Sequence, residues 1–80
     1  MFFVYILYSE SKDRHYIGYS ENPERRLSYH NQGFTKSTKA GAPWKIVYTE
    51  KFETKSEAIK REKFIKRMKS KAFIERLLNN

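Results

Sequence analysis

The chain begins with an apolar run over residues 2–8, Phe-Phe-Val-Tyr-Ile-Leu-Tyr, in which both alternating sets of positions are hydrophobic. This pattern predicts a central β-strand covered on both faces, because a half-exposed strand alternates apolar and polar residues. A polar turn over residues 9–14 follows, and residues 15–20 form a returning strand. The two strands are therefore expected to pair as a hairpin with a long loop.

A helix start follows the second strand. Asn22 can accept hydrogen bonds from the free N–H groups of a first turn, and Pro23 suits the first helical position. We therefore expect a helix over residues 23–32 that ends near Gly33. Residues 33–43 are polar and basic, and this segment is expected to be a loop.

The second half of the chain predicts one strand and two helices. Residues 44–52 have the composition of a third strand. Thr54 and Glu57 have the spacing of a capping box, which predicts a second helix that continues to about Met68. A short last helix is expected after Ser70. The order ββαβαα predicts an α+β fold in which helices flank a three-stranded, mainly antiparallel sheet.

A length of 80 residues fits a single domain over residues 1–80, near the lower limit of what folds unaided. The chain has no cysteine, so it has no disulfide and no thiolate metal site, which favours a reducing compartment. The apolar residues 1–8 are too few to span a bilayer, and they lack the features of a signal peptide. We expect a cytoplasmic protein that does not engage a membrane.

The charge balance is strongly basic. Seventeen Lys and Arg oppose nine Asp and Glu, which gives a net charge of +8. Seven basic residues lie between Lys60 and Lys71, where Glu62 is the single acid. Such a surface, with 13 aromatic residues in the chain, suits nucleic acid, because phosphates attract the charge and bases can stack on exposed rings. The plainer interpretation is a helix that carries solvated lysines.

Glu62 is the unusual carboxylate of the second predicted helix. Ala58, Ile59 and Ile65 are its neighbours at helical spacing, which places Glu62 on or beside the face that turns towards the sheet. A buried charge there needs a cation, a hydrogen-bond donor or a metal. The alternative is a salt bridge to Lys66, one turn later.

Three other groups carry possible chemistry. Arg26 and His30 are four residues apart, so they share a face of the first predicted helix: Arg offers a planar fork for phosphate, and His can transfer a proton. Both could equally be surface residues. Tyr5 and Tyr16 belong to adjacent strands, and most strand tyrosines only pack. A glycine within a strand, here Gly18, indicates a bulge or the close approach of a backbone or ligand.

The spacing of these residues resembles that of the GIY-YIG nuclease superfamily, and it is closest to the small single-domain bacterial, UPF0213-like, group. Phe3-Val4-Tyr5 and Tyr16-Ile17-Gly18 correspond to the two naming motifs, with ten residues between the tyrosines. Arg26 stands where the family keeps its catalytic Arg, His30 follows four residues later, and Ala58-x-x-x-Glu62-x-x-Ile65 resembles the metal-binding Glu helix. The first motif lacks its Gly, and Tyr19 stands where some members carry Lys or His.

The resemblance implies hydrolysis of a DNA phosphodiester with one divalent ion, Mg²⁺ or Mn²⁺. Glu62 would hold the ion, and Arg26 would neutralise charge on the phosphoryl oxygens. Tyr5 or Tyr16 would orient or deprotonate the attacking water, with a pKa lowered by the metal and nearby cations. Tyr5 is favoured as the base. His30 would bind phosphate or assist proton transfer.

Recognition is expected to follow DNA structure, either branched or single-stranded, rather than a specific sequence. The 33–43 segment and the second helix would contact it, or a protein partner would supply targeting. The candidate nucleic-acid contacts are Arg25, Lys36, Lys39, Lys60, Lys63 and Lys66. One alternative is a module that binds nucleic acid without cutting it, and another is an interaction protein whose basic face meets an acidic partner.

Overall fold

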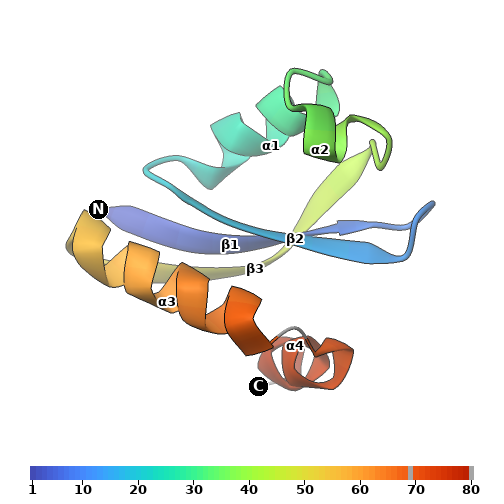
Figure 1. Cartoon of the computed structure of the whole chain (residues 1–80). Coiled ribbons are helices and arrows are strands. Elements are labelled where there is room, and N and C mark those ends of the chain that lie inside the picture. The colour runs from blue at the N-terminus through green and yellow to red at the C-terminus, as the bar shows by residue number, and fades with distance from the viewer. Residues whose placement is uncertain (69, 80) are drawn as a thin grey trace.

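The computed structural model describes residues 1–68 and 70–79. Within them the chain forms a three-stranded sheet and four helices (Figure 1). The elements in chain order are β1 (Phe2–Ser9), β2 (Arg14–Ser20), α1 (Pro23–Asn31), α2 (Lys36–Lys39), β3 (Trp44–Phe52), α3 (Lys55–Met68) and α4 (Lys71–Leu78). The predicted α+β class and the order ββαβαα are confirmed, with the short helix α2 as an addition.

The sheet has the strand order β2-β1-β3, and both neighbouring pairs are antiparallel. The central position predicted for the first strand is therefore confirmed. Val4, Tyr5, Ile6 and Leu7 are all buried, because helices cover both faces of β1. Pairing with β2 is continuous, whereas the register with β3 shifts after Ile6.

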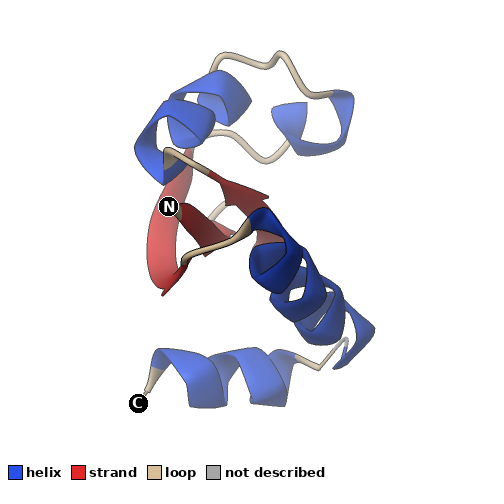
Figure 2. Cartoon of the chain, turned by 90° about the vertical axis from the view of Figure 1, so that its left-hand side faces the viewer, coloured by secondary structure: helices blue, strands red, loops and turns tan. Residues whose placement is uncertain are grey.

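The molecule has three layers. Helices α1 and α2 lie on one side of the sheet, and α3 and α4 lie on the other (Figures 1 and 2). Each side has its own core cluster: Tyr5, Leu7 and Trp44 form one, and Val4, Ala58 and Ile65 form the other. Because side chains alternate along β1, neighbouring residues of one strand supply both cores.

The predicted helix caps are present. The side chain of Asn22 accepts a hydrogen bond from the N–H of Arg25 at 3.1 Å, and Pro23 occupies the first turn of α1. Helix α1 ends at Asn31, and Gly33 follows with a φ of 82°, a conformation that glycine adopts at little cost. Before α3, Thr54 and Glu57 exchange the two hydrogen bonds of a capping box, at 3.2 and 3.3 Å.

The expectation that residues 33–43 form only a loop is wrong, because Lys36–Lys39 make the single helical turn α2. This segment is ordered by polar contacts to neighbouring elements that its own composition does not reveal. The indole N–H of Trp44 donates to the carbonyl of Thr38 at 2.7 Å, and the hydroxyl of Ser9 donates to the carbonyl of Gly41 at 2.6 Å. In the described part of the chain, no helix has the length and apolar character needed to cross a membrane.

Candidate active site

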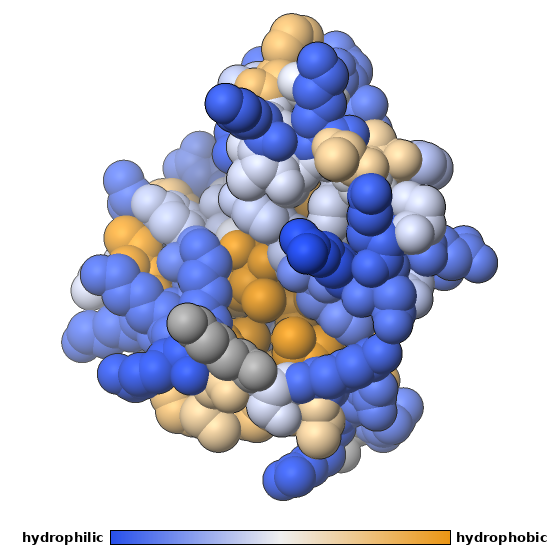
Figure 3. Space-filling view, turned by 45° about the vertical axis from the view of Figure 1, so that its right-hand side comes forward, coloured by the Kyte–Doolittle hydropathy of each residue, from blue (hydrophilic) through white to orange (hydrophobic). Residues whose placement is uncertain are grey.

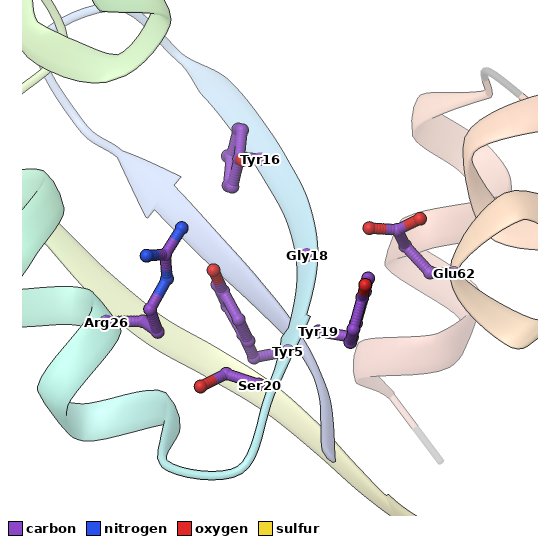
Figure 4. Close-up of a pocket in the computed structure, with 7 residues that line it drawn as sticks. All are labelled: Tyr5, Tyr16, Gly18, Tyr19, Ser20, Arg26 and Glu62. Atoms are coloured by element: carbon purple, nitrogen blue, oxygen red, sulfur yellow. The ribbon is translucent and has the colours of Figure 1, made fainter. Parts of the chain in front are cut away.

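A cavity of about 370 Å³ opens at the edge strand β2, between the layer of α1 and the layer of α3 (Figure 4). Its lining combines aromatic, cationic and acidic side chains from four elements. The lining residues are Tyr5, Tyr16, Gly18, Tyr19, Ser20, Arg26 and Glu62. Four of the five predicted catalytic residues therefore meet at one cavity, although they come from β1, β2, α1 and α3.

The missing side chain of Gly18 leaves the space that the phenol ring of Tyr5 occupies in the cavity wall. The two residues are directly opposite in the β1–β2 ladder, and the phenol ring lies across the glycine. A Cβ on Gly18 would lie 2.6 Å from the hydroxyl oxygen of Tyr5. The sequence predicted a bulge or the close approach of a backbone or ligand here, but the ladder runs through Gly18 without a bulge and the close contact is made by the Tyr5 side chain.

Arg26 reaches the cavity from α1. Its guanidinium points towards the hydroxyl of Tyr5 and towards Tyr16 (Figure 4). The ring centroids of Tyr5 and Tyr16 are 6.4 Å apart. The arginine thus places a permanent positive charge and a planar set of N–H donors next to two phenols, an arrangement that can bind an oxyanion such as phosphate.

Glu62 faces the cavity from α3, on the other side of β2 (Figure 4). Its side chain is only 13% exposed, and it pairs with Lys66 at 3.5 Å. The salt bridge considered from the sequence is therefore formed, and the same carboxylate also belongs to the cavity wall. Tyr19 lies beside it (Figure 4).

His30 is fully buried and does not line the cavity. Its Nε2 lies 3.2 Å from the hydroxyl of Tyr5, and its Nδ1 lies 2.9 Å from the hydroxyl of Thr38. The Thr38 hydroxyl donates its one proton to the carbonyl of Thr35, so it accepts from Nδ1–H of His30. A neutral imidazole then accepts the Tyr5 proton at Nε2. His30 is thus placed to act on Tyr5 rather than to touch phosphate.

The pKa values of this pair follow from burial. Burial, and then the positive charge of Arg26, lowers the pKa of His30, which keeps the imidazole neutral at pH 7. Burial raises the pKa of Tyr5, although Arg26 opposes this effect. Desolvation of the phenolate therefore outweighs the nearby cation at Tyr5, and the lowering expected from a metal together with the cations stays a prediction.

The donor set at the cavity fits a hard divalent cation with few protein ligands. Within residues 1–68 and 70–79, no group of three or more His, Asp or Glu side chains gathers at one point, so Glu62 would be the protein ligand. Mg²⁺ retains several waters and commonly binds one or two carboxylates together with substrate phosphates. A single, partly buried carboxylate on the opposite side of β2 from an arginine is compatible with this mode of Mg²⁺ binding.

The six predicted nucleic-acid contacts are all exposed, and none of them lines the cavity. Arg25 is on α1, Lys36 and Lys39 are on α2, and the other three are on α3. They therefore lie in both helical layers that border the cavity.

A second cavity of about 390 Å³ lies at the hairpin and α4, where Lys71 and Tyr8 both bind the Asp13 carboxylate. Hydrophilic side chains cover most of the face seen in Figure 3, around an apolar hollow.

Sequence reasoning missed three residues of the site. Tyr19 and Ser20 line the cavity, although neither was among the predicted site residues and Tyr19 was noted as a departure from the family motif. Their position directly after the second tyrosine motif is the signal that could have identified them. Thr38 holds the imidazole of His30 from a segment that was expected to be a loop, and no local pattern predicts that contact.

The fold and the cavity define a small α+β domain with a Tyr–Arg–Glu site at a sheet edge, and comparison with known proteins agrees. The model of the GIY-YIG catalytic domain matches residues 1–76. The chain belongs to the GIY-YIG family, and GIY-YIG nucleases act on DNA.

Several curated relatives carry the name UPF0213 protein. One from Natronomonas pharaonis is 42% identical over 95% of this chain and 88% of its own length. A relative from Staphylococcus saprophyticus is 50% identical over 64% of this chain and 63% of its own length. A relative from Clostridium perfringens is 42% identical over 85% of this chain and 73% of its own length. No solved structure gives a significant match. The chain is thus a small GIY-YIG protein of the UPF0213 type.

Proposed function

We propose that this chain is a metal-dependent DNA endonuclease that hydrolyses phosphodiester bonds. The observation that carries the proposal is the meeting of Tyr5, Tyr16, Arg26 and Glu62 at one cavity. A cation and a carboxylate on opposite sides of two phenols match the needs of phosphodiester hydrolysis: charge neutralisation, metal binding and handling of a proton.

Arg26 binds the scissile phosphate. Its planar fork can donate two hydrogen bonds to phosphate oxygens, and its charge stabilises the negative charge that develops on them. The guanidinium points towards the hydroxyl of Tyr5, a residue that is only 1% exposed (Figure 4). Movement of the guanidinium onto phosphate opens that hydroxyl to the attacking water.

Tyr5 accepts a proton from the water and passes its own proton to His30. The water O–H bond breaks and a new O–H bond forms on Tyr5, while the original phenol proton moves to Nε2 of His30 along the 3.2 Å hydrogen bond. This relay avoids a free phenolate, which the raised pKa of Tyr5 disfavours. Thr38 keeps the imidazole in the tautomer that can receive the proton.

Glu62 holds the divalent ion, Mg²⁺ or Mn²⁺, through its carboxylate oxygens. The bound ion supplies polarisation of the phosphate and stabilisation of the leaving oxygen. Lys66, which pairs with Glu62 at 3.5 Å, balances the carboxylate charge until the ion and DNA bind. The exposed basic residues of α1, α2 and α3 attract the DNA backbone, so the substrate is selected by its structure rather than by its sequence. A protein partner that supplies targeting is compatible with this arrangement.

The test is cleavage of labelled single-stranded, duplex, flapped and branched DNAs with Mg²⁺, with Mn²⁺ and with EDTA. The wild type is compared with Glu62→Gln, which keeps the size of the side chain and removes its charge. We expect products only with metal, and none with Glu62→Gln. Because Glu62→Gln also breaks the pair with Lys66, Lys66→Met serves as a second variant, which should still give metal-dependent products.

Products with EDTA, or full activity of Glu62→Gln, would contradict the mechanism. Salt-sensitive DNA binding without products, equal in the wild type and Glu62→Gln, would identify a non-cleaving nucleic-acid-binding module on the same scaffold.

A further inference from the structure

Two exposed aromatic rings lie together beside the proposed phosphate site. Tyr29 is 41% exposed and Phe34 is 63% exposed, and their ring centroids are 5.0 Å apart. Single exposed aromatic residues are common on protein surfaces, but adjacent rings next to a polar cavity mark a binding surface. The proposed catalytic steps make no use of either ring.

Arg26 connects these rings to the cavity. Its guanidinium carbon lies 4.9 Å from the centroid of the Tyr29 ring, and its side chain also lines the cavity. Moving outwards from the cavity, the order of contacts is Arg26, Tyr29 and Phe34. A nucleotide whose phosphate is bound by Arg26 therefore has its neighbour beside the two rings.

One ring lies on a helix, and the other lies in the short connection between α1 and α2. Tyr29 belongs to α1 and makes an edge contact with the buried ring of His30, with centroids 6.4 Å apart. Phe34 follows Gly33, whose φ of 82° turns the chain between α1 and α2. The exposed lysines of α2, Lys36 and Lys39, follow closely in the chain and complement the charge of a DNA backbone.

We propose that Tyr29 and Phe34 form a stacking surface for an unpaired base next to the phosphate at Arg26, and that this surface selects single-stranded or branched DNA over continuous duplex. The inference rests on the proposed function, because it assigns the substrate class of the same site. In a duplex both faces of each base are stacked on its neighbours, so exposed rings can engage only a base that has left the stack. Stacking accepts any base, since every base has a π face.

The experiment measures binding rather than cleavage, in EDTA and at fixed salt, with a fluorescent single-stranded oligonucleotide and with a duplex of the same sequence. Phe34→Leu removes the outer ring without touching the contact between Arg26 and Tyr29. We expect the single strand to bind about tenfold more weakly to Phe34→Leu, and the duplex to change less than twofold. Phe34→Trp, which keeps a stacking face, should retain wild-type affinity for the single strand.

Phe64→Leu is the matched control, because Phe64 is also an exposed ring with arginines beside it, but it lies on α3. It should leave the ratio of single-strand to duplex affinity unchanged. Equal losses for both DNAs with Phe34→Leu, no loss at all, or no single-strand binding by the wild type would overturn the stacking surface. A wild type that binds the single strand through Phe34 but never cleaves would refute the endonuclease and leave the stacking surface in place.

Discussion

The phenol of Tyr5 packs so closely over Gly18 that a side chain at position 18 would have to displace it. The two residues face each other across the β1–β2 ladder, and an added Cβ would lie 2.6 Å from the hydroxyl oxygen and 2.7 Å from the carbon that carries it. That oxygen also hydrogen-bonds His30, so Gly18 and His30 together fix the position of the phenol.

Gly18→Ala should therefore displace the Tyr5 ring. Overpacking of this kind costs about 1–3 kcal/mol of unfolding free energy. We expect a loss of at least about tenfold in cleavage rate, since small misplacement of a reacting group is costly. Urea denaturation and cleavage assays measure the two effects. Ile17→Val, which loses about 0.5–1.5 kcal/mol without touching Tyr5, is the stability control and should cleave normally. Normal cleavage by Gly18→Ala would contradict the role of Tyr5.

Arg26→Lys should keep the positive charge and lose the planar fork. An ammonium group cannot make the paired hydrogen bonds of a guanidinium, so we expect the cleavage rate at saturating DNA to fall by about 10²–10³-fold. Affinity for DNA should fall much less, because the charge is retained. Single-turnover kinetics separate the two quantities. If affinity falls while the saturated rate is unchanged, Arg26 holds DNA and takes no part in the chemical step.

Thr38→Val should leave the buried Nδ1–H of His30 without an acceptor. An unsatisfied buried polar group costs about 1–3 kcal/mol, which chemical denaturation can measure. The imidazole would also lose the contact that fixes its tautomer, so the cleavage rate should fall as well. Thr38→Ser keeps the hydroxyl and serves as the conservative variant. It should retain the cleavage rate of the wild type, and if it behaves like Thr38→Val, the hydroxyl is not the group that matters.

The stability of the protein should fall as the pH drops below about 6.5. Burial, and then Arg26, lowers the pKa of His30 in the folded state, so between that lowered value and the unfolded value near 6.5 the unfolded chain binds more protons. The stabilisation is complete above about pH 6.5 and is lost as the pH falls through the folded pKa. One histidine contributes a slope of at most about 1.4 kcal/mol per pH unit.

Urea titrations between pH 7 and pH 5 measure this dependence. Burial also lowers the pKa of His15, so His15→Gln removes the contribution of that residue and is the proper reference. Adding His30→Gln to it should flatten the remaining slope over the same range. An unchanged slope in the double variant would show that His30 does not titrate as its surroundings require.

The sequence by itself determined every element of the described chain except α2, and it determined the central place of β1 in the sheet. The apolar run of β1 requires cover on both faces. Two helix starts are predicted by residues that cap them through local hydrogen bonds, namely Asn22, Thr54 and Glu57. Such features depend on neighbours a few residues apart, which is why they can be read from the chain. The spacing of Tyr5, Tyr16, Arg26 and Glu62 also sufficed to select candidates.

Only the tertiary structure decided how these candidates act. It brought Arg26 and Glu62 to opposite sides of β2, buried His30 behind Tyr5, and raised the pKa of Tyr5 by burial. It also ordered the segment around Thr38. Burial and contact between residues far apart in sequence depend on the packing of whole layers, and no local pattern carries that information.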